Sequence, residues 1–214
     1  MVLIGRYRSP FSRRVAIALR LLEMPYEHRP QTAWRNLQDV RAANPVGRVP
    51  ALILDSGETL FDSSAILDHL DQLAGPARAL VPPHEPLRRE VLRTVACALG
   101  VLEKVVAALY ERTMHPPEKV HQPWIEHNEG QALSGLDWLA ALHPAPWLAG
   151  ARLTQADITV VVMYDFTRIV NPRLIPDGKY PSLDELAMLS GRLPAFRETR
   201  PSSEVDQANP ALPM

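Results

Sequence analysis

The chain has a single cysteine, Cys97, among its 214 residues, so it cannot form a disulfide within itself. No apolar run approaches the ~20 residues that a membrane-spanning helix needs, and the first residues lack the basic start and apolar stretch of a signal peptide. A formal net charge of −1 gives no basic surface for nucleic acid or anionic lipid. These absences favour a cytoplasmic protein that binds neither nucleic acid nor membrane.

Metal and nucleotide motifs are also missing from the sequence. His115, His121 and His127 are six residues apart. This spacing does not place them on one helical face, whereas metal ligands at i and i+4 share a face. The chain contains no P-loop and no G-x-G-x-x-G fingerprint. We therefore expect no metal and no nucleotide cofactor.

Proline is abundant, with 21 residues that fall mostly between the predicted elements. The stretch from Gly75 onward is the densest, and it contains Pro76, Pro82, Pro83 and Pro86. Such a stretch is typical of a linker, because proline interrupts both helices and strands. We predict a first domain at residues 1–76, a linker at 77–86, a second domain at 87–200 and a tail at 201–214.

Strands and helices alternate in the first domain. The apolar run at 2–7 and the segments at 26–30 and 51–54 predict strands, and 59–61 is predicted to return after a turn as the second strand of a hairpin with 51–54. Helical spacing of apolar residues predicts helices at 10–24, 34–43 and 63–73. The order β-α-β-α-β-β-α indicates a small mixed sheet covered by helices.

Strand signals nearly vanish in the second domain. The pattern predicts long helices at 87–114, 118–142 and 154–170, the second with a potential break near Gly130, and short helices at 183–190 and 193–200. The T-x-x-D sequence from Thr154 to Asp157 is a capping-box pattern before the most apolar of these helices. We expect it to be structural.

Four stretches carry a family resemblance when they are taken together in order: SPFSRRVAIAL, NPVGRVPAL, DSSAILDHL and WLAGARLTQADI. The chain resembles the cytosolic glutathione transferases over nearly its whole length, and the SPF corner is most similar to serine-type classes such as tau, zeta and theta. The resemblance implies an α/β thioredoxin-like N-terminal domain, an all-α C-terminal domain and a homodimer. It also implies glutathione as co-substrate and a small apolar electrophile as its partner.

Ser9 precedes Pro10 at the start of the first predicted helix, where serine is a common N-cap. The resemblance implies a second role, in which the Ser9 hydroxyl donates to the sulfur of glutathione. A thiol with a pKa near ~8.5 is mostly protonated at neutral pH, whereas the thiolate is the nucleophile. Ser12 and Tyr7 are alternative hydroxyls. Arg13 and Arg14 are predicted to lie on a solvated helix face, with the alternative that either adds positive potential near the site.

Cysteine is absent from position 9. The omega class and the glutaredoxins, which carry cysteine there, react through a mixed disulfide that Ser9 cannot form. Cys97 lies between Ala96 and Ala98 on an apolar helix face, and we expect it to behave as a small buried hydrophobic residue.

Two further motifs match glutathione-binding positions of the family. At the position of Val49-Pro50 the family has a cis peptide bond. The resemblance implies that the Val49 main chain, beside this bond, pairs with the cysteinyl part of glutathione. Arg48 is a candidate to bind the glycine carboxylate of glutathione. Asp62-Ser63 is a good helix cap in its own right, and the resemblance implies that it also binds the γ-glutamyl group, at free amides of the helix start.

The electrophile site is predicted from Tyr110, Met114 and His115, near the end of the first long helix, although such residues are more often part of a core. The leading hypothesis is a glutathione transferase. A glutathione-dependent isomerase or dehalogenase would use the same thiolate. The third hypothesis is a protein-binding adaptor with this fold, which tends to lose the site motifs that this chain retains.

Overall fold

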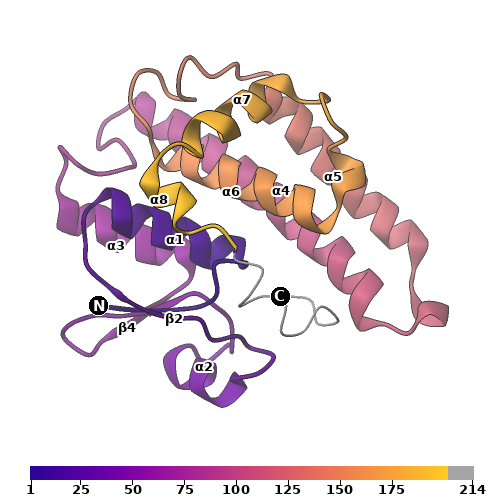
Figure 1. Cartoon of the computed structure of the whole chain (residues 1–214), viewed down its shortest axis with the longest axis horizontal. Coiled ribbons are helices and arrows are strands. Elements are labelled where there is room, and N and C mark those ends of the chain that lie inside the picture. The colour runs from indigo at the N-terminus through magenta and orange to yellow at the C-terminus, as the bar shows by residue number, and fades with distance from the viewer. Residues whose placement is uncertain (202–214) are drawn as a thin grey trace. The chain divides into compact units, whose positions relative to one another are not determined.

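The computed structural model describes residues 1–201, so all but the first residue of the expected tail lies outside them. The chain divides into two compact units (Figure 1). The first, here the N-terminal unit, holds residues 1–80 and the segment that begins at Arg192. The second, the helical unit, spans Val81–Gly191.

The N-terminal unit is built on one mixed four-stranded sheet in the order β2-β1-β3-β4. The strands are β1 (Val2–Ile4), β2 (Glu27–Arg29), β3 (Ala51–Ile53) and β4 (Thr59–Phe61). β1 runs parallel to β2 and antiparallel to β3, with Leu3 opposite both His28 and Leu52. β3 and β4 form an antiparallel hairpin. The predicted order β-α-β-α-β-β-α and the mixed sheet are confirmed.

Three helices cover this sheet: α1 (Pro10–Leu21), α2 (Leu37–Ala43) and α3 (Ser63–Ala74). α1 and α3 pack against each other on one face, and α2 lies against the other (Figure 1). Ile4 and Ala51 form a buried cluster with Val40 of α2. Because side chains alternate along a strand, the fully buried pair Leu3 and Leu52 faces the α1–α3 side. Both faces are covered, which explains why the two central strands, β1 and β3, read as continuous apolar runs.

The first strand is shorter than the predicted 2–7, because it ends before Gly5. Gly5 has φ = +133°, a backbone conformation that interrupts a strand and that favours glycine. A Cβ at this position would lie 2.2 Å from Ser12 Oγ. The glycine therefore lets the end of β1 approach α1 closely.

A short helix near the C-terminus, α8 (Pro194–Arg197), packs against α1 within the N-terminal unit. The sequence pattern instead predicts that residues 193–200 belong to the second, helical domain. Phe196 of α8 is only 1% exposed, and its carbonyl accepts a hydrogen bond from Arg13 Nη2 at 3.5 Å. Burial of that apolar side chain on α1 accounts for the difference.

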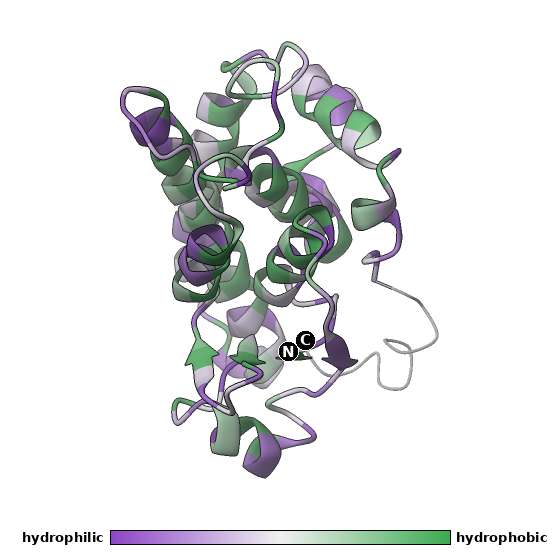
Figure 2. Ribbon diagram, turned by 90° about the vertical axis from the view of Figure 1, so that its left-hand side faces the viewer, coloured by the Kyte–Doolittle hydropathy of each residue, from purple (hydrophilic) through white to green (hydrophobic). Residues whose placement is uncertain are grey.

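The helical unit contains α4 (Leu87–Met114), α5 (Gln122–Ala140), α6 (Gln155–Val170) and α7 (Pro181–Ser190), with 3-10 turns at Pro117–Lys119 and Pro172–Leu174. α4 packs along both α5 and α6. Hydrophobic and hydrophilic stretches alternate on these helices (Figure 2), as expected for amphipathic helices packed side by side. Within residues 1–201, no helix is both long and apolar enough to cross a membrane.

The helix predicted at 118–142 begins later than expected and does not break at Gly130. It starts at Gln122 with Pro123 in its first turn, where the missing N–H of proline is tolerated. A glycine inside a helix weakens it without necessarily ending it.

The capping box at the start of α6 is confirmed. Asp157 Oδ2 accepts hydrogen bonds from the backbone N–H and the hydroxyl of Thr154, at 2.8 and 2.9 Å. Asp157 Oδ1 accepts from the Leu148 N–H at 2.8 Å. Burial raises the pKa of this carboxyl, and these hydrogen bonds oppose the rise. The residue holds a loop to a helix start, as its position in the sequence indicated.

Candidate functional site

Ser9 caps α1 and remains partly exposed. Its backbone is extended (φ −69°, ψ 119°), and Pro10 occupies the first helical position. The Ser9 Oγ accepts a hydrogen bond from the Ser12 N–H at 3.4 Å. Since the oxygen acts as the acceptor, the hydroxyl hydrogen can still be donated to an anion at the positive end of the helix.

Ser12, the first alternative hydroxyl, lies beneath this corner. It is fully buried, and its Oγ has no hydrogen-bond partner among the described residues. Gly5 leaves just enough space for it. A ligand on the surface would contact Ser9 before it could reach Ser12.

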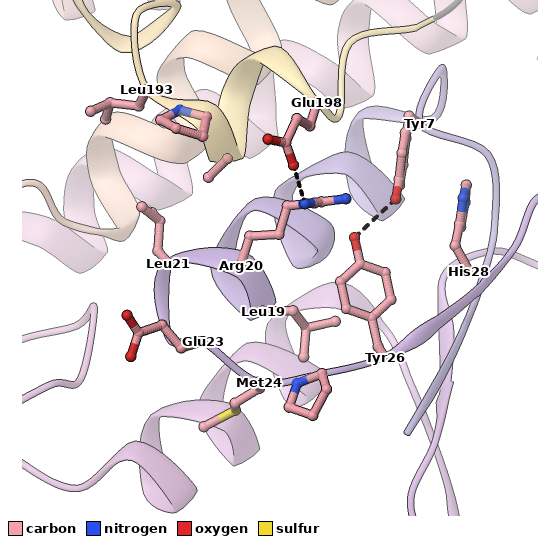
Figure 3. Close-up of a pocket in the computed structure, with 13 residues that line it drawn as sticks. Tyr7, Leu19, Arg20, Leu21, Glu23, Met24, Tyr26, His28, Leu193 and Glu198 are labelled. Atoms are coloured by element: carbon pink, nitrogen blue, oxygen red, sulfur yellow. Dashed lines mark hydrogen bonds and ion pairs between the residues drawn. The ribbon is translucent and has the colours of Figure 1, made fainter.

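Tyr7, the second alternative, points into a pocket of about 680 Å³ that Figure 3 shows. Its hydroxyl bonds the hydroxyl of Tyr26 at 2.9 Å, and its ring stacks on His28 with centroids 4.0 Å apart. Burial raises the pKa of Tyr7 far above its ordinary value, and the Tyr26 hydroxyl adds to the rise. Ser9 is not among the residues that line this pocket. Tyr7 therefore serves this pocket rather than the Ser9 corner.

The Val49-Pro50 bond is cis, as the resemblance implied. Val49 is partly buried against the cluster on the α2 face, and the Arg48 side chain is exposed. Buried Asn44 organises this loop: its Nδ2 donates to the Arg48 carbonyl at 2.8 Å, and its Oδ1 accepts from the Val46 N–H at 3.0 Å. The sequence motif NPVGRVPAL includes Asn44, but nothing in the motif alone indicates this role.

Asp62 caps α3 in a strained conformation. Its φ is +68°, which costs a non-glycine residue on the order of 1–3 kcal/mol and is common at ligand sites. The exposed side chain accepts from the Ser64 N–H at 2.8 Å through Oδ1. This turn places a carboxylate beside the free amides at the start of α3.

Ser63, the first residue of α3, is buried against an arginine of α1. Its Oγ accepts a hydrogen bond from Arg14 Nη1 at 3.3 Å. The prediction of a solvated face for Arg13 and Arg14 was wrong, because they are 3% and 1% exposed. The helical spacing could have revealed this for Arg14, which is four residues before the buried Ala18.

The three residues predicted for the electrophile lie at the end of α4 in the helical unit. Tyr110 is partly buried and Met114 is 41% exposed. His115 follows the last helical residue, and its Nδ1 lies 3.3 Å from Glu111 Oε1. Tyr110 and Met114 thus lie in the last two turns of α4, and His115 caps its C-terminus.

Cys97 is half-buried rather than fully buried, and its Sγ approaches the Gly135 carbonyl at 3.7 Å. Burial raises the pKa of this thiol, so it is held protonated. Across residues 1–201, no group of three or more His, Cys, Asp or Glu side chains is arranged to hold a metal ion.

Models of known protein families match both units of the chain. Residues 3–78 match the glutathione S-transferase N-terminal domain, and residues 122–186 match the glutathione S-transferase C-terminal domain. A maleylacetoacetate isomerase of Pseudomonas aeruginosa is 34% identical, over 96% of this chain and 98% of its own length. The chain belongs to the glutathione S-transferase family. It is accordingly an enzyme of the glutathione transferase type.

Further relatives of this glutathione S-transferase agree with the assignment. A zeta-class glutathione S-transferase of Euphorbia esula is 26% identical, over 97% of this chain and 93% of its own. Among solved structures, a glutathione S-transferase of Methylobacillus flagellatus with glutathione bound superposes with a TM-score of 0.88. It is 26% identical, and the match covers 94% of this chain and 99% of that one. The fold is thus a thioredoxin-like N-terminal domain followed by a helical C-terminal domain.

Proposed function

We propose that this glutathione S-transferase binds glutathione on its N-terminal unit and holds the sulfur as a thiolate at Ser9. The observation that carries the proposal is the partly exposed Ser9 hydroxyl at the start of α1, with its oxygen already accepting from the Ser12 N–H. Lowering a thiol pKa by ~2 units corresponds to about 2.7 kcal/mol. A charge-assisted hydrogen bond together with a helix N-terminus is of that order.

The rest of the tripeptide would lie along motifs already described. The start of α3 offers free amides and the Ser63 hydroxyl to the γ-glutamyl carboxylate, and Asp62 offers its carboxylate to the α-amino group. The Val49 main chain would pair with the cysteinyl residue. The exposed Arg48 would bind the glycine carboxylate.

In the transferase reaction the thiolate attacks a small apolar electrophile, forms a carbon–sulfur bond and displaces the leaving group. Tyr110, Met114 and His115 remain our candidates for contacts with that electrophile. We also propose that the enzyme is a cytoplasmic homodimer, as its family resemblance implies.

Isomerisation of an unsaturated acid is a second candidate, and the 34% identity to a maleylacetoacetate isomerase over nearly the full length of both chains favours it. The same thiolate would add to a carbon–carbon double bond, which becomes a single bond that can rotate. Elimination of the thiolate then restores the double bond in the trans form and regenerates glutathione. Glutathione would be required without being consumed.

Two assays separate these reactions. The purified full chain is incubated with glutathione and 1-chloro-2,4-dinitrobenzene, and chloride release and loss of free thiol are measured. It is then incubated with maleylacetoacetate, and the trans product is followed with free thiol monitored in parallel. Conjugation with thiol loss supports the transferase, and a trans product at constant thiol supports the isomerase.

Binding is tested independently on immobilised glutathione, from which free glutathione should release the protein. A chain that is not retained and that catalyses neither reaction would contradict the proposal and leave the adaptor hypothesis ahead.

A further inference from the structure

A buried arginine lies directly beneath the start of α3. Arg14 belongs to α1, is 1% exposed and donates from Nη1 to Ser63 Oγ at 3.3 Å. α1 and α3 pack side by side on the sheet (Figure 1). This contact joins the helix that Ser9 caps to the helix that begins at Ser63.

The charge of Arg14 is poorly compensated. Burial lowers the pKa of this guanidinium to about 10 and the nearby Asp62 carboxylate opposes the fall, so the group remains a cation at neutral pH. Among the described residues, no carboxylate lies within ion-pair distance of Arg14, and its Nε has no hydrogen-bond partner. A buried cation without an ionic partner is costly for a fold. An anion supplied from outside the protein would offset that cost.

The contact with Ser63 also orients a hydroxyl. Because the Ser63 oxygen accepts from Arg14, its own hydrogen is directed to another acceptor. The free amides of α3 and its helix dipole favour an anion at the same place. Three features therefore select a carboxylate here: the buried cation, the oriented hydroxyl and the helix start.

We propose that Arg14 is a positioning residue for the α-carboxylate of the γ-glutamyl group, acting through the Ser63 hydroxyl and through its buried charge. This inference rests on the proposed binding of glutathione. Arg14 itself is too buried to touch the ligand, so its effect is transmitted by Ser63.

The test compares two ligands whose only difference is the carboxylate in question. Glutathione and 4-aminobutanoyl-Cys-Gly, which is glutathione without the α-carboxylate, are titrated into the full-length protein by calorimetry. The wild-type protein should prefer glutathione by about ten-fold or more, the range of hydrogen bonds to charged groups. In Arg14→Met this preference should shrink by about ten-fold, and Arg14→Lys should restore part of it.

Arg13→Met is the matched control, because Arg13 is the adjacent buried arginine and donates to the Phe196 carbonyl instead of Ser63. It should leave the preference between the two ligands unchanged. Cooperative thermal unfolding of each variant establishes that it is folded. If Arg14→Met does not fold, Arg14→Gln provides the test, since it removes the buried charge and keeps an amide that can donate to Ser63, and it should shrink the preference in the same direction.

A merely structural Arg14 would give a different pattern. Arg14→Met would then weaken both ligands equally and keep their ratio, which would overturn the inference, as would an unchanged ratio in Arg14→Gln. Failure of the proposed function is distinguishable, because the wild-type protein itself would bind neither ligand.

Discussion

Ser9 Oγ accepts a hydrogen bond from the Ser12 backbone N–H at 3.4 Å, so one oxygen caps α1 while its hydrogen remains to be donated. Replacing Ser9 with alanine removes both interactions. We expect the pKa of enzyme-bound glutathione to rise and the activity near neutral pH to fall by about ten-fold or more. The pH dependence of kcat/KM and the ultraviolet absorbance of the bound thiolate measure these effects.

Controls for Ser9→Ala come from the two alternative hydroxyls. Ser12→Ala changes a fully buried group, and Tyr7→Phe changes one that bonds Tyr26. Neither should alter the pKa of the bound thiol. Normal activity in Ser9→Ala, with a loss in either of these two variants, would transfer the role away from Ser9.

Asp62 combines a strained backbone with a carboxylate proposed to bind the ligand. Asp62→Gly relieves the strain of the positive φ of +68°. It also removes the side-chain cap of α3, but glycine at an N-cap position costs little stability. We expect the free energy of unfolding to stay constant or rise by about 1 kcal/mol, while the Kd for glutathione increases. Chemical denaturation and calorimetric titration measure the two quantities.

Asp62→Asn separates charge from conformation at the same position. Asparagine tolerates positive φ and can still cap the helix, so stability should change little. Loss of the carboxylate should nevertheless weaken glutathione binding by roughly ten-fold, as expected for a charge-assisted bond. Equal affinity in the wild-type protein and Asp62→Asn would exclude an ion pair with the α-amino group.

Gly5 is required by conformation and by space. Gly5→Ala would combine a φ of +133° with a Cβ 2.2 Å from Ser12 Oγ, and we expect it to destabilise the protein by about 2–4 kcal/mol. Gly57→Ala is the matched control, because its φ is +86° and no atom lies within 4 Å of the new Cβ. Its cost should be about 1 kcal/mol. Equal losses in the two variants, measured by denaturant unfolding, would disprove the close contact.

His28 makes the stability of the fold depend on pH. Burial lowers its pKa below the ordinary 6.5, Arg20 contributes to the fall, and the contact of Nε2 with the Gly5 carbonyl at 2.9 Å opposes it. The unfolded chain therefore binds a proton more readily than the folded one. Stability present above pH 6.5 should be lost progressively as the pH falls through the lowered pKa of the folded state.

The measurement for His28 is the free energy of unfolding between pH 7.5 and pH 5. His28→Gln should flatten this profile, whereas replacement of the exposed His84 by glutamine should leave its slope as in the wild-type protein. A profile that is equally steep in His28→Gln would show that other groups are responsible.

The sequence by itself determined the order of elements, because apolar periodicity and proline placement are local properties. Three helices, α1, α3 and α6, begin at Pro10, Ser63 and Gln155. These first residues follow from N-caps that depend only on a few neighbouring residues. The family motifs around Ser9, Val49 and Asp62 were likewise readable from short stretches, and the family resemblance they indicated is confirmed.

Only the tertiary structure decided which of these side chains are buried and what they contact. The sequence predicts Arg14 on the surface, whereas the packing of α3 beside α1 buries it. Likewise, α8 belongs to the N-terminal unit because it contacts α1, which is far from it in the sequence. The buried Ser12 and the Tyr7–Tyr26 contact likewise required the folded chain. The physical reason is that burial and electrostatic partners depend on packing between distant segments, whereas caps and helical periodicity are set within one or two turns.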